Sequence, residues 1–127
     1  MRCSVAAALA LSLYSSGAMS ISERIDMRLG CKGNPQLAGA CFAVRGRLSA
    51  YNGNPTFRIR PVGTQRLLGV IDDEQRLSVP ADIRDLIGFE NDIFADYVVC
   101  PFTAPGAGHM QYVCVESATH LRVGQRR

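Results

Sequence analysis

The sequence lacks the short motifs that carry common enzyme chemistry. It has no Cys-x-x-Cys pair, so a thioredoxin-type redox site is not expected. The stretch 63–69, GTQRLLG, lacks the Lys-Ser/Thr pair of a phosphate-binding loop. Its two histidines, His109 and His120, lie in no recognisable catalytic motif, and nucleophilic catalysis needs a base beside a serine or cysteine. We therefore expect a protein that is not an enzyme and that needs no cofactor.

The sequence also lacks an apolar run of about 20 residues, the length needed to cross a bilayer. Its apolar run VAAALALSLY follows Arg2 and precedes the small residues SSGAMS. This is the layout of a secretory signal peptide. We expect residues 1–20 to be removed and residues 21–127 to form a single domain of a periplasmic or secreted protein. The alternatives are a cut after Ala18 and an ordinary buried helix in place of the signal.

Cysteines are few, and an exported chain would lose Cys3 with the signal. An even number then remains, which predicts two disulfides in an oxidising compartment. Four cysteines allow three connectivities. We favour one bond between the first two and one between the last two, because each pair brackets a short segment containing glycine and proline. No two of them are two to four residues apart, so no metal site is expected. The four are Cys31, Cys41, Cys100 and Cys114.

Alternating apolar and polar residues predict strands in the first half of the mature chain. From Phe42 to Tyr51 the alternation has the period of two that a strand with one face in a core requires. The turn NGNP separates this segment from a second strand, which Pro61 ends because proline cannot donate to the ladder. A third short strand is predicted for 65–71, before the charged turn DDEQR.

The second half of the chain predicts a helix and then two strands. In segment 79–88, Pro80 suits a first helical turn and apolar residues fall on one face. Strands are predicted for 93–102 and for 110–117, and the tail from residue 119 adds a short pairing segment before it frays.

The order of these elements points to a fold class. Three strands, one short helix and two further strands, with short connections, are typical of the OB-fold. We therefore predict a mostly β protein, a small OB-fold-like five-stranded antiparallel barrel with one short helix between strands 3 and 4. The alternative is a plain antiparallel sandwich with a helix across one end.

Two stretches carry a resemblance to a known group of proteins. They are GRLSAYNGNPTFRIRPVGTQRLLGV and CPFTAPGAGHMQYVCVESATHL, with the Tyr-Asn-Gly turn, the Pro-Val-Gly-Thr segment and the two late cysteines. Over residues 39–123 the chain resembles small exported bacterial proteins of unknown function. The resemblance implies an exported location and one compact domain, and it implies no activity.

Acidic residues are absent from the whole stretch 27–71, which contains seven basic ones, whereas 72–96 contains eight acids and two arginines. If the first two strands form a hairpin, four of these arginines share its non-core face. Arginine presents a planar fork of donors that suits phosphate or carboxylate, and a tyrosine beside it offers a stacking surface. The candidate ligand-binding residues are Arg45, Arg47, Tyr51, Arg58 and Arg60.

The basic face sets the functional hypothesis. We expect a binding module for an anionic envelope polymer, a lipid headgroup or an acidic protein. Nucleic acid fits less well, because aromatic residues for base stacking are few. The sequence pI of about 8.7 is also below the value of about 9 above which nucleic-acid-binding domains usually lie. The alternative is a structural or protein–protein interaction module of the cell envelope, in which the basic face of one copy meets the acidic 72–96 region of another. In the simplest interpretation, the arginines only form a solvated sheet face.

Overall fold

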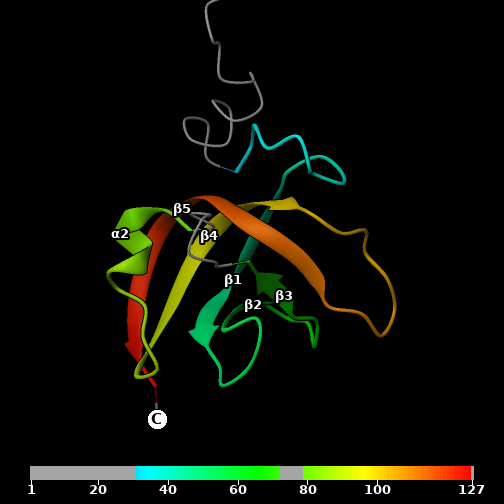
Figure 1. The fold of residues 1–127 in the computed structure, drawn as a ribbon. Helices are drawn as coiled ribbons and strands as arrows, with labels where there is room; N and C mark the ends of the chain where they lie inside the picture. Colours follow the sequence, from blue (N-terminus) through cyan, green and yellow to red (C-terminus); the bar gives the residue numbers. More distant parts are fainter. Residues whose placement is uncertain (1–30, 72–78, 127) are drawn as a thin grey trace, which may run out of the picture.

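The structure is a computed structural model that describes residues 31–71 and 79–126. These residues form a mostly β fold, in which one short helix lies between the third and fourth strands (Figure 1). The predictions for the signal peptide, for its cleavage site and for the charged turn after Ile71 fall outside the described residues. The elements are β1 (Phe42–Ala50), β2 (Phe57–Pro61), β3 (Leu68–Val70), α2 (Ala81–Arg84), β4 (Asn91–Pro101) and β5 (Gln111–Gln125).

The strands pair in a closed ring in the order β1-β2-β3-β5-β4, and β4 returns to β1. The sheet is mixed, because β3 and β5 run parallel while the other neighbours are antiparallel. The prediction of a fully antiparallel sheet was therefore wrong. Its physical reason is the connection: α2 and β4 lie between β3 and β5, and a crossover of this length allows two strands to pair in the same direction.

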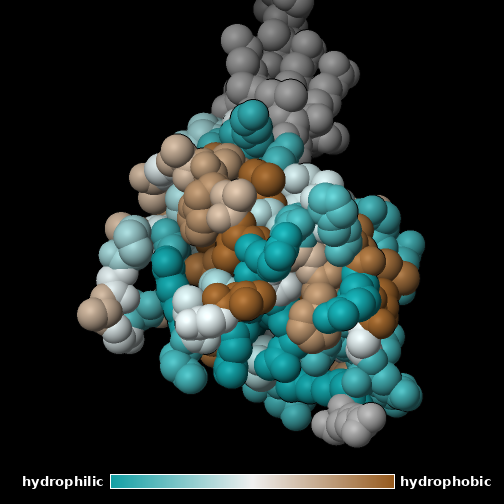
Figure 2. Space-filling model, turned by 180° about the vertical axis from the view of Figure 1, so that it is seen from behind, coloured by the Kyte–Doolittle hydropathy of each residue, from teal (hydrophilic) through white to brown (hydrophobic). Residues whose placement is uncertain are grey.

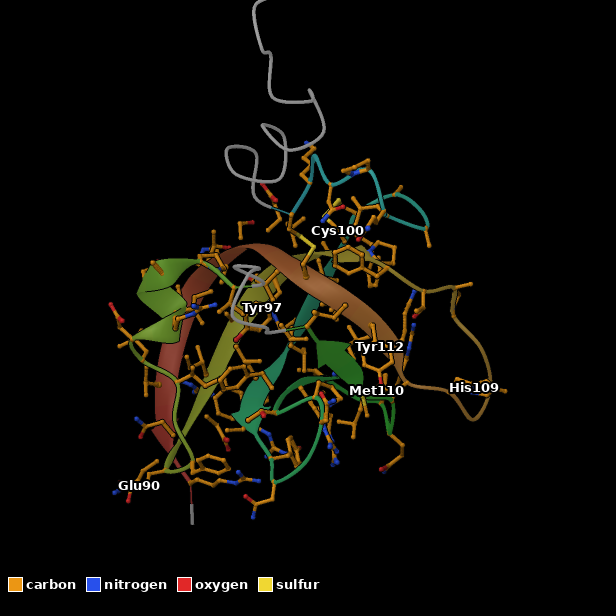
Figure 3. All side chains as sticks on the ribbon, in the orientation of Figure 1. Glu90, Tyr97, Cys100, His109, Met110 and Tyr112 are labelled. Atoms are coloured by element: carbon orange, nitrogen blue, oxygen red, sulfur yellow. A yellow bond between two sulfur atoms is a disulfide. The ribbon has the colours of Figure 1, made fainter. Side chains whose placement is uncertain are left out.

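The core fills the inside of the ring. Along β1 and β4 alternate side chains point inward, as the period of two predicted, and those of Leu48 and Ile93 are fully buried. Tyr97 is the largest fully buried side chain, and Figure 3 shows it inside the ring. The buried residues of this core are Leu48, Ile59, Leu68, Val70, Val79, Ile83, Ile93, Ala95, Tyr97, Val99, Val113 and Val115.

The predicted helix is present but short. α2 begins after Pro80, carries Asp82 in its first turn and buries Ile83 in the core together with Val79. Backbone bonds from Leu86 and Ile87 to the carbonyl of Ile83 add one more turn. No helix within 31–71 or 79–126 is long and apolar enough to span a bilayer.

The disulfide pairing that the sequence favoured is wrong. The bonds join Cys31 to Cys114 and Cys41 to Cys100, with sequence separations of 83 and 59 residues. Cys100 and Cys114 do lie opposite each other in the β4–β5 pair, as a stapled hairpin requires. However, each bonds to a cysteine of segment 31–41, which passes over this end of β4 and β5 (Figures 1 and 3). The sequence favoured local disulfides because each pair brackets a short segment. In the fold, segment 31–41 lies next to the ends of β4 and β5, so its two cysteines are closer to Cys100 and Cys114 than to each other.

β5 is longer than the sequence predicted. It continues through residues 118–125, which pair with the first half of β4, so the pairing segment predicted for the tail is present and is part of β5. Leu121 and Val123 alternate with polar neighbours, but both are exposed, so this half of the strand adds no side chain to the buried core. The extension brings His120, Arg122 and Arg126 into the folded domain.

Tyr97 should make the domain less stable at alkaline pH. Burial raises the pKa of its phenol, because the charged tyrosinate loses its solvation. A raised pKa stabilises the folded state fully below the ordinary tyrosine pKa of about 10, and this stabilisation is lost as the pH rises above it. Urea unfolding at pH 7 and at several values above pH 10 should show this loss.

Tyr97→Phe provides the control for this alkaline effect. The variant should be about 1 kcal/mol less stable at pH 7, because the hydroxyl donates a 2.6 Å bond to the carbonyl of Ile93. It should also lose less stability above pH 10 than the parent protein. An equal alkaline loss in both proteins would show that Tyr97 is not the responsible group.

Candidate functional site

Arginines from three strands form a row on the outer face of the sheet, the face turned away from the core. The β1–β2 register places Arg47 directly opposite Arg60, and the β1–β4 register places Arg47 opposite Phe94. Phe94 in turn lies opposite Arg122 in β5, and the Arg122 guanidinium lies 5.0 Å from the centre of the Phe94 ring. We call these four residues, Arg60, Arg47, Phe94 and Arg122, the arginine row.

A carboxylate lies near one of the two arginines that face each other. The Nε of Arg47 lies 3.9 Å from an oxygen of Asp92, whose residue exposure is 8%. This carboxylate offsets part of the repulsion between the paired cations. The Nε atoms of Arg47 and Arg60 are buried and make no hydrogen bond within the described part of the chain. The side chain of Arg47 as a whole is 37% exposed, so a ligand can contact its exposed part although its Nε is buried.

The ring of Tyr51 contacts two arginines of the same chain. The guanidinium of Arg58 lies 4.8 Å from the centre of the ring, and that of Arg126 lies 5.2 Å from it. Both are held by the backbone: Arg58 donates to the carbonyl of Pro55 at 3.1 Å, and Arg126 donates to the carbonyl of Ala50. The ring that was expected to offer a stacking surface is therefore already in contact with two cations.

Arg45 has an acidic neighbour instead of a basic one. It lies opposite Asp96 of β4, and its Nε donates to that carboxylate at 2.7 Å. Nδ1 of His120 lies 3.0 Å from the other oxygen of Asp96. The hydrogen bond from Arg45 lowers the pKa of the Asp96 carboxyl, and the contact with His120 lowers it further. The same bond raises the pKa of Arg45. All three side chains reach solvent, and that of Arg45 is 75% exposed.

The structure brings most of the predicted site together and adds to it. Arg47 and Arg60 are paired, Arg58 and Tyr51 are in contact, and Arg45 lies on the same outer face beside Asp96. The sequence did not indicate that β4 and the end of β5 border this face. Alternation along 92–96 was the available signal for β4, since its polar and aromatic members face outward once β4 pairs with β1. The missed residues are Asp92, Phe94, Asp96, His120, Arg122 and Arg126.

The surface seen from behind is hydrophilic over much of its area. Figure 2 shows hydrophilic side chains over most of the lower half of the molecule, with smaller hydrophobic groups between them. A ligand on this surface would contact hydrophilic side chains with small apolar groups between them.

Two other groups that the sequence raised have structural roles. His109 lies in the loop between β4 and β5, where its backbone N–H donates to Gly106 at 3.3 Å, and Figure 3 shows its side chain away from the ring. The sulfurs of Cys31, Cys100 and Cys114 lie within 4.8 Å of one another, but all three are in disulfides. Thiolates are the form that binds metal, so this cluster is a covalent staple.

Comparison with protein-family models, curated protein sequences and solved structures finds no match to this chain.

Proposed function

We propose that this protein is an exported, non-enzymatic binding module that binds an anionic polymer of the cell envelope on its arginine-rich outer face. The closed ring of five strands, with its helix between β3 and β4, supports an OB-like barrel, a fold that exposes sheet surface to extended ligands. Two disulfides are consistent with an oxidising compartment, which supports export.

The arginine row is the observation that carries the proposal. It crosses the four neighbouring strands β2, β1, β4 and β5. Strands lie about 4.8 Å apart, so the row extends over about 14 Å. Arg58 and Arg126 lie beside it on Tyr51 and extend the basic surface. A row of this length matches successive charges of a linear polyanion better than it matches a single small ion.

The alternative in which copies pair through opposite charges has less support. It needs the acidic 72–96 region of one molecule to be available to another. Two acids of that region, Asp92 and Asp96, already face Arg47 and Arg45 of the same molecule. They moderate the charge of the basic face instead of forming an acidic face elsewhere.

Replacing Arg47 and Arg60 together by alanine should weaken binding of an anionic polymer at least about tenfold. Each hydrogen bond to a charged group contributes about 1.5 kcal/mol or more, and the double variant removes two donors. We would measure binding of residues 21–127 to polygalacturonate, single-stranded DNA and acidic lipid vesicles at 20 and 150 mM salt. Because exposed charges are screened, affinity should fall with added salt.

Two further variants make this experiment specific. Asp92→Asn keeps the shape of the side chain and removes its negative charge, so it should raise affinity for the same polymer. Lys32→Ala removes one exposed positive charge from the segment before β1, and it should leave affinity nearly unchanged. Equal losses in Lys32→Ala and in the double variant would mean that net charge, not the arginine row, governs binding. Absence of binding to all three polyanions would refute the proposed function.

A further inference from the structure

A pocket of about 390 Å³ includes the Phe94–Arg122 end of the arginine row, on the outer side of β1, β4 and β5. Pockets that bind small molecules start at about 300 Å³, so its size suits one small ring or a short oligomer. We call it the bulge pocket, because a β-bulge forms one wall. It is lined by Arg45, Val62, Phe94, Ala95, Asp96, His120 and Arg122.

The bulge gathers extra side chains at this point. Phe94 lies opposite Arg122, and Asp96 lies opposite Thr119, so two residues of β5 oppose the single residue Ala95 of β4. Bulges of this kind turn a side chain in a new direction and are common next to functional sites. Here the additional residue is His120, which the bulge places next to Asp96 in the pocket wall.

His120 has an unusual backbone conformation. Its φ is 55°, and among the described residues it is the one non-glycine with a positive φ. This left-handed region is sparsely populated by residues with a side chain, and strain of this kind is often associated with function. A glycine would adopt the conformation without strain. Histidine at this position therefore adds an imidazole that glycine would lack, and its Nδ1 lies 3.0 Å from Asp96.

The lining combines three kinds of chemistry. Arg45 and Arg122 provide positive charge and hydrogen-bond donors. Asp96 provides acceptor oxygens, and the Nδ1 contact of His120 leaves its other ring nitrogen for a ligand. Val62, whose exposure is 65%, and Phe94 provide apolar surface.

We propose that the bulge pocket binds a sugar ring that carries a carboxylate, one acidic unit of an anionic polysaccharide. This inference rests on the proposed function and names the unit that the polymer contains. The carboxylate lies between Arg45 and Arg122, the ring hydroxyls bond to Asp96 and His120, and the carbon–hydrogen face of the ring packs on Val62 and Phe94.

Asp96 is the reason to favour an acidic sugar over phosphate. A free phosphate carries up to two negative charges and has few hydrogen-bond donors. The carboxylate of Asp96 in the pocket wall therefore repels it. A sugar ring carries one negative charge and several hydroxyl donors, which a carboxylate accepts. Val62 and Phe94 would make no favourable contact with phosphate, whereas they can pack against the carbon–hydrogen face of a sugar ring.

The test is an NMR titration of ¹⁵N-labelled residues 21–127 with trigalacturonic acid. Maltotriose serves as the neutral sugar, and inorganic phosphate as the simple anion. Trigalacturonic acid should shift the amide signals of residues 94–96 and 119–122, and the two comparison ligands should shift them much less. Arg122→Ala should weaken binding at least tenfold, and Lys32→Ala should not change it.

His120→Gly separates recognition from folding. This variant removes the imidazole and relieves the backbone, so it should be at least as stable as the parent protein and bind at least threefold more weakly. Unchanged affinity in this variant would contradict the role of His120.

The remaining outcomes also decide the inference. Signal changes confined to residues 47, 58 and 60 would overturn the bulge pocket and leave only the Arg47–Arg60 end of the arginine row as the binding surface. Phosphate binding as tight as that of trigalacturonic acid, or no binding of trigalacturonic acid, would overturn the acidic sugar. The polymer experiments decide the proposed function independently.

Discussion

Removal of the Cys41–Cys100 disulfide by replacing both residues with alanine should lower the free energy of unfolding by about 4 kcal/mol. A disulfide stabilises mainly by restricting the unfolded chain, and its effect grows with the length of the closed loop. The separation here is 59 residues, and that of Cys31–Cys114 is 83. Loops near 15 residues contribute about 3 kcal/mol and loops near 100 contribute about 4.7 kcal/mol, so both native bonds lie toward the upper end.

A loss of this size is a large part of the 5–15 kcal/mol that typically stabilises a small domain. Urea unfolding of the two double-alanine variants, monitored by circular dichroism, measures it. The variant lacking Cys31–Cys114 should lose at least as much as the variant lacking Cys41–Cys100. A loss below about 1 kcal/mol in either variant would show that the bond does not restrain the unfolded chain as its separation predicts.

The connectivity itself has a direct chemical test. Met110 lies between Cys100 and Cys114, so cyanogen bromide separates these two cysteines before trypsin divides the rest. Without reduction, mass spectrometry should find peptide 29–32 joined to 111–122, and peptide 33–45 joined to 85–110. Peptide 29–32 joined to 33–45 would instead support the local pairing, and would require segment 31–41 to lie differently over β4 and β5.

Gly46→Ala should destabilise the domain by about 1–3 kcal/mol although it adds a single methyl group. Gly46 faces inward from β1, where β2 approaches closely. An added Cβ would lie 2.8 Å from the backbone oxygen of Arg60 and 2.9 Å from the Cγ2 of Ile59. The oxygen belongs to the sheet backbone and cannot move aside without disturbing the β1–β2 pair. Thermal unfolding should show a lower melting temperature, by roughly 4–8 °C per kcal/mol.

Gly88→Ala is the matched control for this variant. An added Cβ at Gly88 would meet no atom within 4 Å, and its φ is not positive. Alanine then restricts only the unfolded chain, which should stabilise the protein by about 0.4–1 kcal/mol. The two substitutions should therefore change stability in opposite directions. A stable Gly46→Ala variant would mean that β1 and β2 can separate, and the opposition of Arg47 to Arg60 would then also be in doubt.

Local features of the sequence were sufficient to predict five strands and their order along the chain, although not the full length of β5. Residues 42–50 and 57–61 alternate with a period of two, and Pro80 with the apolar residues after it indicated the short helix. The same alternation placed Arg47 and Arg60 on the outer face. These features depend on neighbouring residues, and they fix which face of a strand is apolar wherever the strand is later placed.

The tertiary structure decided which strands and side chains meet. The parallel pairing of β3 with β5, the bonds of Cys31 and Cys41 to the last two strands, and the position of Asp96 beside Arg45 all join residues more than 40 positions apart. Such contacts form because closing the ring buries the core and satisfies strand edges together, a gain that no single segment provides. The sequence by itself therefore determined a basic strand face, and closure of the ring determined the acids, the aromatic ring and the histidine that border it.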